Sequence, residues 1–192
     1  RALSGTGTFE KDGAGTLTLT GNNAGFAGGS ARVANGTLVA RVASLPVDVL
    51  VQSGARLVFD QPVAASYANV VTGTGDVEKR GAGRLTFANA QTYAGTTTVS
   101  NGRLDVLGAL ATSGVTVASA ATLGGTGTIA SGVTASGRIA PGTSIGTLSA
   151  NSVSFANGSV LEIEVAPGAG MNDLLAVTNA ASLTGGTLEL VV

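Results

Sequence analysis

A short pattern recurs along nearly the whole sequence: an apolar residue, several small or polar residues, and a second apolar residue five or six positions later. Internal repeats with periods of roughly 20–50 residues are typical of solenoids and related arrays. Here successive copies begin 16 to 30 residues apart, at Leu3, Val33, Val51, Val71, Val99, Val117, Val133, Phe155 and Val177. The recurrence predicts a chain that coils back on itself, with one copy of the pattern in each coil.

A second, longer repeat lies over this one. Residues 5–19 read GTGTFEKDGAGTLTL, and residues 73–87, 68 positions later, read GTGDVEKRGAGRLTF. We interpret the interval as three coils of about twenty-two residues that are used once and then again. The expected organisation is a single β-helical segment over residues 1–192, with modules at about 3–70, 71–122 and 123–192.

Within each coil the local signals indicate strands and turns. Segments such as TLTLT (16–20) and VLEIEV (160–165) alternate in side-chain character, and Thr and Val dominate, as on a pleated surface. Asn-Gly pairs fall between such runs and also suit antiparallel hairpins, but hairpins do not explain a steady period near twenty residues. We therefore predict an all-β fold, a right-handed parallel β-helix (solenoid) of about eight to ten coils.

The pattern also predicts which side chains face the interior. Val33, Val51, Val71, Val99, Val117, Val133, Phe155 and Val177 should form one interior column, or nearly so. Thr116, one position from Val117, should face outward, because successive side chains on a strand point to opposite faces.

Composition excludes several classes of function. Ten basic and eleven acidic residues show no basic cluster, which argues against a nucleic-acid partner. No apolar run is long enough to insert in a membrane as a helix. With no His and no Cys, the usual nucleophile systems and zinc sites are excluded. Both ends lie inside patterned sequence, so we expect a fragment of a longer protein.

Parallel β-helices also house polysaccharide lyases and hydrolases, whose sites need clustered carboxylates. Glu162 and Glu164 share one face of a strand and form a conceivable pair, although a solvated outer face is the simpler interpretation. Glu10-Lys11 and Glu78-Lys79 recur beside a Gly-Ala-Gly turn. Either they bind a ligand twice, or they are charges that keep an extended loop in water, which is the interpretation we favour.

The glycines and the aromatic residues also have competing explanations. GTGTFE and GTGDVE do not complete a dinucleotide-binding motif, no P-loop motif exists, and the tandem calcium-binding nonapeptide array is missing. Turn glycines that need positive φ explain these segments better. Phe26 and Tyr93 occupy equivalent repeat positions, which favours packing over a sugar-stacking platform. We expect no catalytic, cofactor-binding or metal-binding residues, and no cofactor.

Four segments together resemble bacterial autotransporter (type V secretion) passengers and their passenger-associated strand repeats. They are EKxGAGxLTL, YAGTTTVSNGRLDV (93–106), the run from LGGTGTIASGV to VLEIEV (123–165), and NDLLAVTNAASLTGGTLELVV (172–192). The last one departs from the family at Asn172, where a Ser is common. The resemblance covers almost the whole chain.

The resemblance implies a surface-exposed β-helical stalk, exported through the C-terminal outer-membrane barrel of the same chain and then displayed at the cell surface or secreted. Its implied partners are a host-cell or matrix surface, or other copies through self-association of the parent protein. Two alternatives remain: a segment whose stable coils drive folding after export, and a carbohydrate-active β-helix enzyme. An enzyme would bring three or more carboxylates together on neighbouring coils.

Overall fold

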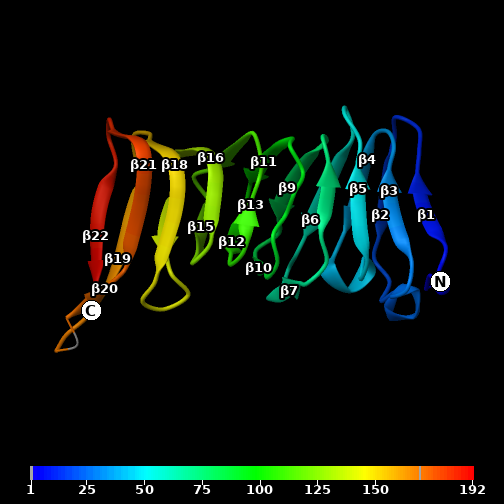
Figure 1. The fold of residues 1–192 in the computed structure, drawn as a ribbon, viewed down its shortest axis with the longest axis horizontal. Helices are drawn as coiled ribbons and strands as arrows, with labels where there is room; N and C mark the ends of the chain where they lie inside the picture. Colours follow the sequence, from blue (N-terminus) through cyan, green and yellow to red (C-terminus); the bar gives the residue numbers. More distant parts are fainter. Residues whose placement is uncertain (1, 169) are drawn as a thin grey trace.

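The computed structural model describes residues 2–168 and 170–192. The chain forms a rod of stacked coils, with its N-terminus at one end and its C-terminal strands at the other (Figure 1). Only 3% of the chain is helical, and the parallel sheets stack as a β-solenoid of about eight turns. The predicted fold class, an all-β parallel solenoid, is confirmed. Among the residues described, no helix is long and apolar enough to cross a membrane.

Three parallel sheets form the sides of the rod, and we call them faces A, B and C. Face A begins with four short strands, each hydrogen-bonded to the next coil: β1 (Thr8–Lys11), β3 (Ser30–Val33), β5 (Asp48–Val51) and β8 (Val71–Gly73). These strands are rich in β-branched residues, which suit a pleated, half-buried surface.

Face B runs the full length of the rod. Its strands, in spatial order, are β2 (Thr16–Leu19), β4 (Thr37–Ala40), β6 (Arg56–Asp60), β9 (Asp76–Arg80), β11 (Thr96–Val99), β14 (Gly114–Val117), β16 (Thr128–Ala135), β18 (Thr147–Phe155) and β21 (Leu174–Leu183). Adjacent coils of a parallel sheet lie about 4.8 Å apart, so eight steps extend about 38 Å.

Face C starts only in the third coil. Its parallel strands are β7 (Ala65–Tyr67), β10 (Arg84–Phe87), β12 (Gly102–Val106), β15 (Ala121–Gly125), β17 (Arg138–Pro141), β19 (Val160–Ala166) and β22 (Thr187–Val191). In the first two coils single 3-10 turns occupy this side, η1 (Ala24–Phe26) and η2 (Val42–Ser44). β19 also pairs antiparallel with β20 (Met171–Asn172) in a hairpin that projects at the C-terminal end (Figure 1).

Face A continues beyond β8 without forming separate long strands. The amides of Thr92 and Ala94 donate to the carbonyls of Val71 and Gly73 at 3.0 and 2.8 Å. β13 (Ala109–Leu110) then pairs with the start of β16. β16, β18 and β21 cross from face A to face B as single strands, with register shifts at Ile129/Gly132 and Ala150/Ser152. In the last coils the two faces are therefore one continuous sheet.

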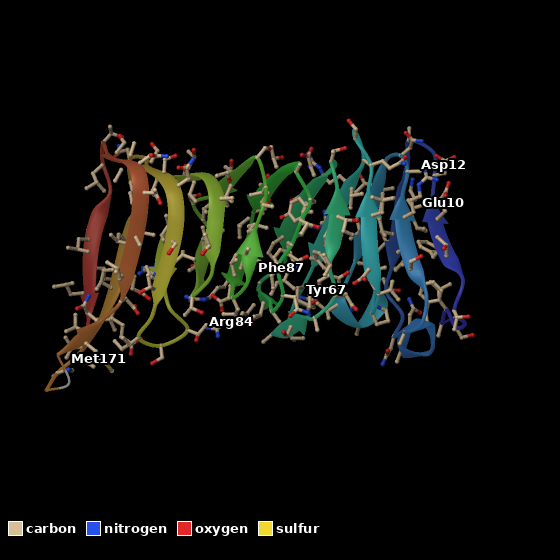
Figure 2. The ribbon with its side chains drawn as sticks, viewed as in Figure 1. Glu10, Asp12, Tyr67, Arg84, Phe87 and Met171 are labelled. Carbon is tan, nitrogen blue, oxygen red and sulfur yellow. The ribbon has the colours of Figure 1, made fainter. Side chains whose placement is uncertain are left out.

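The interior is a ladder of aligned apolar side chains. On face B one row in register reads Leu19, Ala40, Phe59, Lys79, Val99, Val117, Ala135, Phe155 and Leu183. Lys79 is the charged member of this row, and Leu183, in the last coil, is 70% exposed. Phe59, Tyr67 and Phe87 meet edge to face across the lumen, with ring centroids 4.9 to 6.3 Å apart. Figure 2 shows Tyr67 and Phe87 within the middle of the rod.

The predicted interior residues are buried, but they do not form one column. Seven of the eight are at most 3% exposed, whereas Val177, in the last coil, is only partly buried. Val33, Val51 and Val71 lie on face A, while Val99, Val117, Val133 and Phe155 lie on face B. The prediction of a single column is wrong because strand alternation reveals which side chains point inward, but not which face a strand occupies.

The interval of 68 residues between the two copies of the long repeat is not a whole number of coils. In register, Phe9 aligns with Ala31, Val49 and then Val71, so three coils take 62 residues. The repeat partner of Phe9 is Val77, six residues further on, and it lies on face B. The interpretation of the interval as three coils is therefore wrong: the second copy begins one face further around the rod.

Candidate functional site

Lys11 is buried at the corner between faces A and B. Alternation on β1 directs it inward with Phe9, and it is 6% exposed. Its ammonium group donates to the carbonyls of Asp12, Gly13 and Asn35 at 2.9, 2.6 and 2.9 Å. Asn35 belongs to the next coil, so Lys11 ties two successive turns together where no strand ladder exists.

Lys79 repeats this arrangement at the corner between faces B and C. It is 1% exposed and donates to the carbonyls of Arg80, Gly81 and Asn101 at 3.0, 2.7 and 3.0 Å. Burial lowers the pKa of Lys79 to about 8, and the Asp60 carboxylate opposes this shift. Three carbonyl acceptors match the three donors of an ammonium group. Lys11 and Lys79 are called the corner lysines below.

The expectation that both lysines lie in water is therefore wrong, although their role is structural. The sequence contained the signal that was missed. On an alternating strand, Lys11 shares the face of Phe9 and Lys79 shares the face of Val77. Within each Glu-Lys pair only the glutamate points outward.

The glycines of the repeat allow these corners to stack. Gly36 adopts a φ of +68°, which an L-residue with a side chain rarely takes. A Cβ on Gly36 would also lie 2.5 Å from the carbonyl oxygens of Gly13 and Gly15 in the coil below. Gly102 is held in the same way against the carbonyls of Gly81 and Gly83. The GAG and NG motifs recur together because one turn rests directly on the other.

Buried amide side chains bind backbone groups at two bends, Gln91 between faces C and A and Asn23 where the chain leaves face B for the η1 turn. Gln91 accepts from the amide of Val71 at 2.8 Å and donates to the carbonyls of Asn69 and Asn89 at 3.2 and 3.0 Å. Asn23 accepts from the amide of Leu3 and donates to the carbonyl of Ser44, both in other coils. Backbone groups that leave the strand ladder at a bend need such partners when buried.

A hydroxyl network fills the interior at the fifth coil. Tyr93 and Thr97 share a hydrogen bond of 2.5 Å, and Thr97 donates to Thr112, which donates in turn to the carbonyl of Gly95. Burial raises the pKa of Tyr93, which keeps the phenol neutral. Phe26, its repeat equivalent, is also buried at 6% exposure. The packing interpretation of these two aromatic residues is confirmed.

The acidic side chains mostly bind another coil. Glu10 pairs with Arg32 at 2.8 Å, Glu78 with Arg56 at 3.4 Å and Asp60 with Arg80 at 3.4 Å. Other carboxylates accept from backbone amides of a different coil, as Asp173 does from Gly146 at 2.8 Å. Figure 2 shows Glu10 and Asp12 near the N-terminal end of the rod.

Face C holds two further charge clusters. Asp105 is fully buried between Arg84 and Arg103, at 3.2 and 2.6 Å. Glu162 is joined by Arg138 to Glu189, its register neighbour on the next coil. Glu162 and Glu164 lie two residues apart on β19. The carboxylate of Asp173 accepts a hydrogen bond from the backbone amide of Glu164 at 2.9 Å.

Within the described ranges, no group of three or more acidic side chains is placed to hold a metal ion. The candidate site is therefore the set of buried polar side chains at the bends: Lys11, Lys79, Gln91 and Asn23. Their hydrogen bonds hold one coil in register with the next. Lys11 and Lys79 occupy equivalent places in two copies of the same unit, which extends from an inward-facing strand through a GAG corner to an NG corner.

That unit matches a known family model. The model described as a passenger-associated-transport-repeat matches residues 9–40 and 77–106, each running from the strand that bears a corner lysine through the NG corner above it. These two segments carry the passenger-associated transport repeat. These repeats account for the corner lysines, their carbonyl partners and the stacked glycines.

A similarity to a longer exported protein agrees with this. Over 127 residues, which are 65% of this chain, the sequence is 38% identical to the extracellular serine protease of Serratia marcescens. The match covers 12% of that relative, so the chain corresponds to a small part of its length. The region matched by the passenger repeats resembles a passenger segment and not a catalytic domain.

Proposed function

We propose that this segment is a structural stalk of an autotransporter passenger, which displays distal adhesive or effector regions at the bacterial cell surface. The observation that carries the proposal is the continuity of the rod. One interior runs along the coils, and the corner side chains of Lys11, Lys79 and Gln91 link successive coils. A rod of this kind holds a region attached to one end at a fixed distance from the other end, and it needs no reactive group to do so.

The same architecture suits export. In a solenoid each coil contacts only its neighbours, so stability adds coil by coil and folding can spread from one end. The passenger repeats and the extracellular relative support secretion to the cell surface or the extracellular space. We propose that the coils fold in sequence as the chain emerges and so assist export. A barrel of the same chain and a host or matrix surface are the partners that this role requires.

Deletion of single coils in the exported protein distinguishes a spacer from a binding or catalytic segment. An in-phase deletion removes one whole coil, so that the residue after the junction takes the register position of the first residue removed. Removing residues 116–133 places Thr134 after Val115, and removing residues 39–57 places Val58 after Leu38. For a stalk, both variants are exported and displayed, and the activity of the distal region persists.

Surface labelling of intact cells and protease accessibility provide the measurements. If one of the two deletions abolishes the activity of the parent protein while its display is unchanged, the deleted coil holds a specific site and the stalk proposal fails. If turnover of a polysaccharide by the 192-residue chain is lost on Glu162→Gln, the enzyme alternative replaces it.

A further inference from the structure

Three Asn-Gly pairs stand at bends between strands: Asn35-Gly36, Asn101-Gly102 and Asn157-Gly158. All three asparagines are exposed, and all three glycines have a positive φ. In an Asn-Gly pair the asparagine side chain closes readily on the nitrogen of the next residue, because glycine has no Cβ to block the approach. The turns themselves need the glycines, whereas the surroundings of the three asparagine side chains differ.

The side chain of Asn35 is fixed by a neighbouring carboxylate. Its amide nitrogen Nδ2 donates to Oδ1 of Asp12, in the coil below, at 2.7 Å. Hydrogen bonds from Asn35 and from the amide of Gly13 lower the pKa of Asp12, so this carboxylate is charged at neutral pH. The side chain of Asn35 can therefore turn toward Gly36 only by giving up a charge-assisted hydrogen bond.

Asn157 is restrained by the last coil. A Cβ on Gly185 would lie 2.9 Å from Cα and 3.1 Å from Oδ1 of Asn157, so the turn at Gly185 rests directly on the asparagine. The main-chain amide of Gly158 donates to the carbonyl of Gly185 at 3.2 Å. The nitrogen that would have to attack this side chain is thus already engaged.

Asn101 lacks these restraints. Arg80 stands at the position that Asp12 has in the first copy, and its guanidinium pairs with Asp60 at 3.4 Å. The Asn101 side chain is exposed and, within the described ranges, makes no hydrogen bond. Its main-chain carbonyl accepts from the ammonium of Lys79 at 3.0 Å. This contact draws electron density out of the peptide group between Asn101 and Gly102, which eases loss of the proton from the Gly102 nitrogen.

We propose that Asn101 is a site of spontaneous modification, at which the side chain closes on the main chain and releases ammonia. The Gly102 nitrogen gives up its proton to solvent and attacks Cγ of Asn101. A C–N bond forms, the bond from Cγ to Nδ2 breaks, and Nδ2 takes up a proton and leaves as ammonia. Water then opens the cyclic imide at either carbonyl, which leaves aspartate or isoaspartate at position 101. The inference goes beyond the stalk function and does not depend on it.

The isoaspartate product disrupts the corner that Lys79 holds. Its main chain runs through the former side chain and is longer by a CH2 group. Gly102 has no spare room for this change, because a Cβ there would lie 2.4 and 2.6 Å from the carbonyl oxygens of Gly81 and Gly83. The lengthened chain also displaces the carbonyl of residue 101 from the Lys79 ammonium. Modification at this position should therefore loosen the link between the two coils.

Incubation of the folded 192-residue chain in mildly alkaline buffer, followed by peptide mapping with mass spectrometry, tests the proposal. Asn101 should deamidate at least about tenfold faster than Asn35 or Asn157, because each of those must first give up a hydrogen bond. In concentrated urea, where no coil is formed, the three rates should be similar. The modified fraction carries an additional negative charge, separates on an anion exchanger and should unfold at a lower urea concentration than the unmodified chain.

Two substitutions at equivalent positions exchange the surroundings of the two asparagines. Arg80→Asp gives the second copy the carboxylate of the first and should slow the reaction at Asn101 at least about fivefold, whereas Asp12→Arg should accelerate the reaction at Asn35 by a similar factor. Both residues are exposed, so each variant should keep the fold, which circular dichroism checks. Equal rates at the three asparagines of the folded chain, an Asn101 that stays intact there while it reacts in urea, or substitutions that leave both rates unchanged would overturn the proposal.

Discussion

Lys79→Met removes the ammonium group at the corner of faces B and C and keeps a side chain of similar length in the interior. Three carbonyls then lose their donor, those of Arg80, Gly81 and Asn101. An unsatisfied buried acceptor costs about 1–3 kcal/mol. Arg80 and Asn101 are exposed residues, so water reaches part of this corner and the lower value applies. The substitution should lower the free energy of unfolding by about 3 kcal/mol in total.

Urea denaturation followed by circular dichroism measures the effect as a shift of the midpoint. Arg80→Met is the matched control, because it removes the same charge one position away. Arg80 is exposed and makes only a 3.4 Å ion pair with Asp60, so its loss should change stability by at most about 1 kcal/mol. If Lys79→Met is no more destabilising than Arg80→Met, the corner lysine does not hold the coils and the reasoning is refuted.

Three further outcomes follow. Val117→Asp places a charge in the interior and should destabilise the fold by at least about 3 kcal/mol in urea, whereas Thr116→Asp, on the outer side, should have little effect; equal effects would contradict the register. Gly102→Ala should destabilise by about 1–2 kcal/mol more than Gly54→Ala, because both have positive φ but only Gly102 rests against carbonyls; thermal unfolding distinguishes them. The folded pKa of Lys79, about 8, lies below its ordinary 10.5, so the unfolded chain holds more protons between these values. The difference in the free energy of unfolding between the wild type and Lys79→Met should therefore rise from about pH 8 to pH 10. A difference that falls over this range would contradict a lowered pKa of Lys79 in the folded state.

The period of the apolar pattern was sufficient to predict the solenoid, because each coil must bury an equivalent set of side chains. It could not assign strands to faces, since a step from one face to the next changes neither the alternation nor the residue types. Val71 and Val99 look equivalent in the sequence, yet they lie on faces A and B.

The candidate site was harder to predict. The repeat of Lys11 and Lys79 was visible, but a buried lysine is rare enough that exposure was the natural expectation. Strand alternation alone would have directed both inward. Gln91 and Asn23 gave no such signal, because their partners are carbonyls and amides of other coils, and these contacts exist only after the chain has closed each turn.

The central claim is that the repeats are structural rungs of one continuous rod. The most direct test compares an in-phase deletion with an out-of-phase one. Deleting residues 116–133 preserves the register, while deleting residues 116–127 joins Val115 to Thr128, which belongs to face A. Small-angle scattering with circular dichroism should show a folded rod, shorter by about 4.8 Å, for the first variant and loss of the ordered fold beyond the junction for the second. If both variants fold equally well, or if neither does, the account of stacked, phase-locked coils is contradicted.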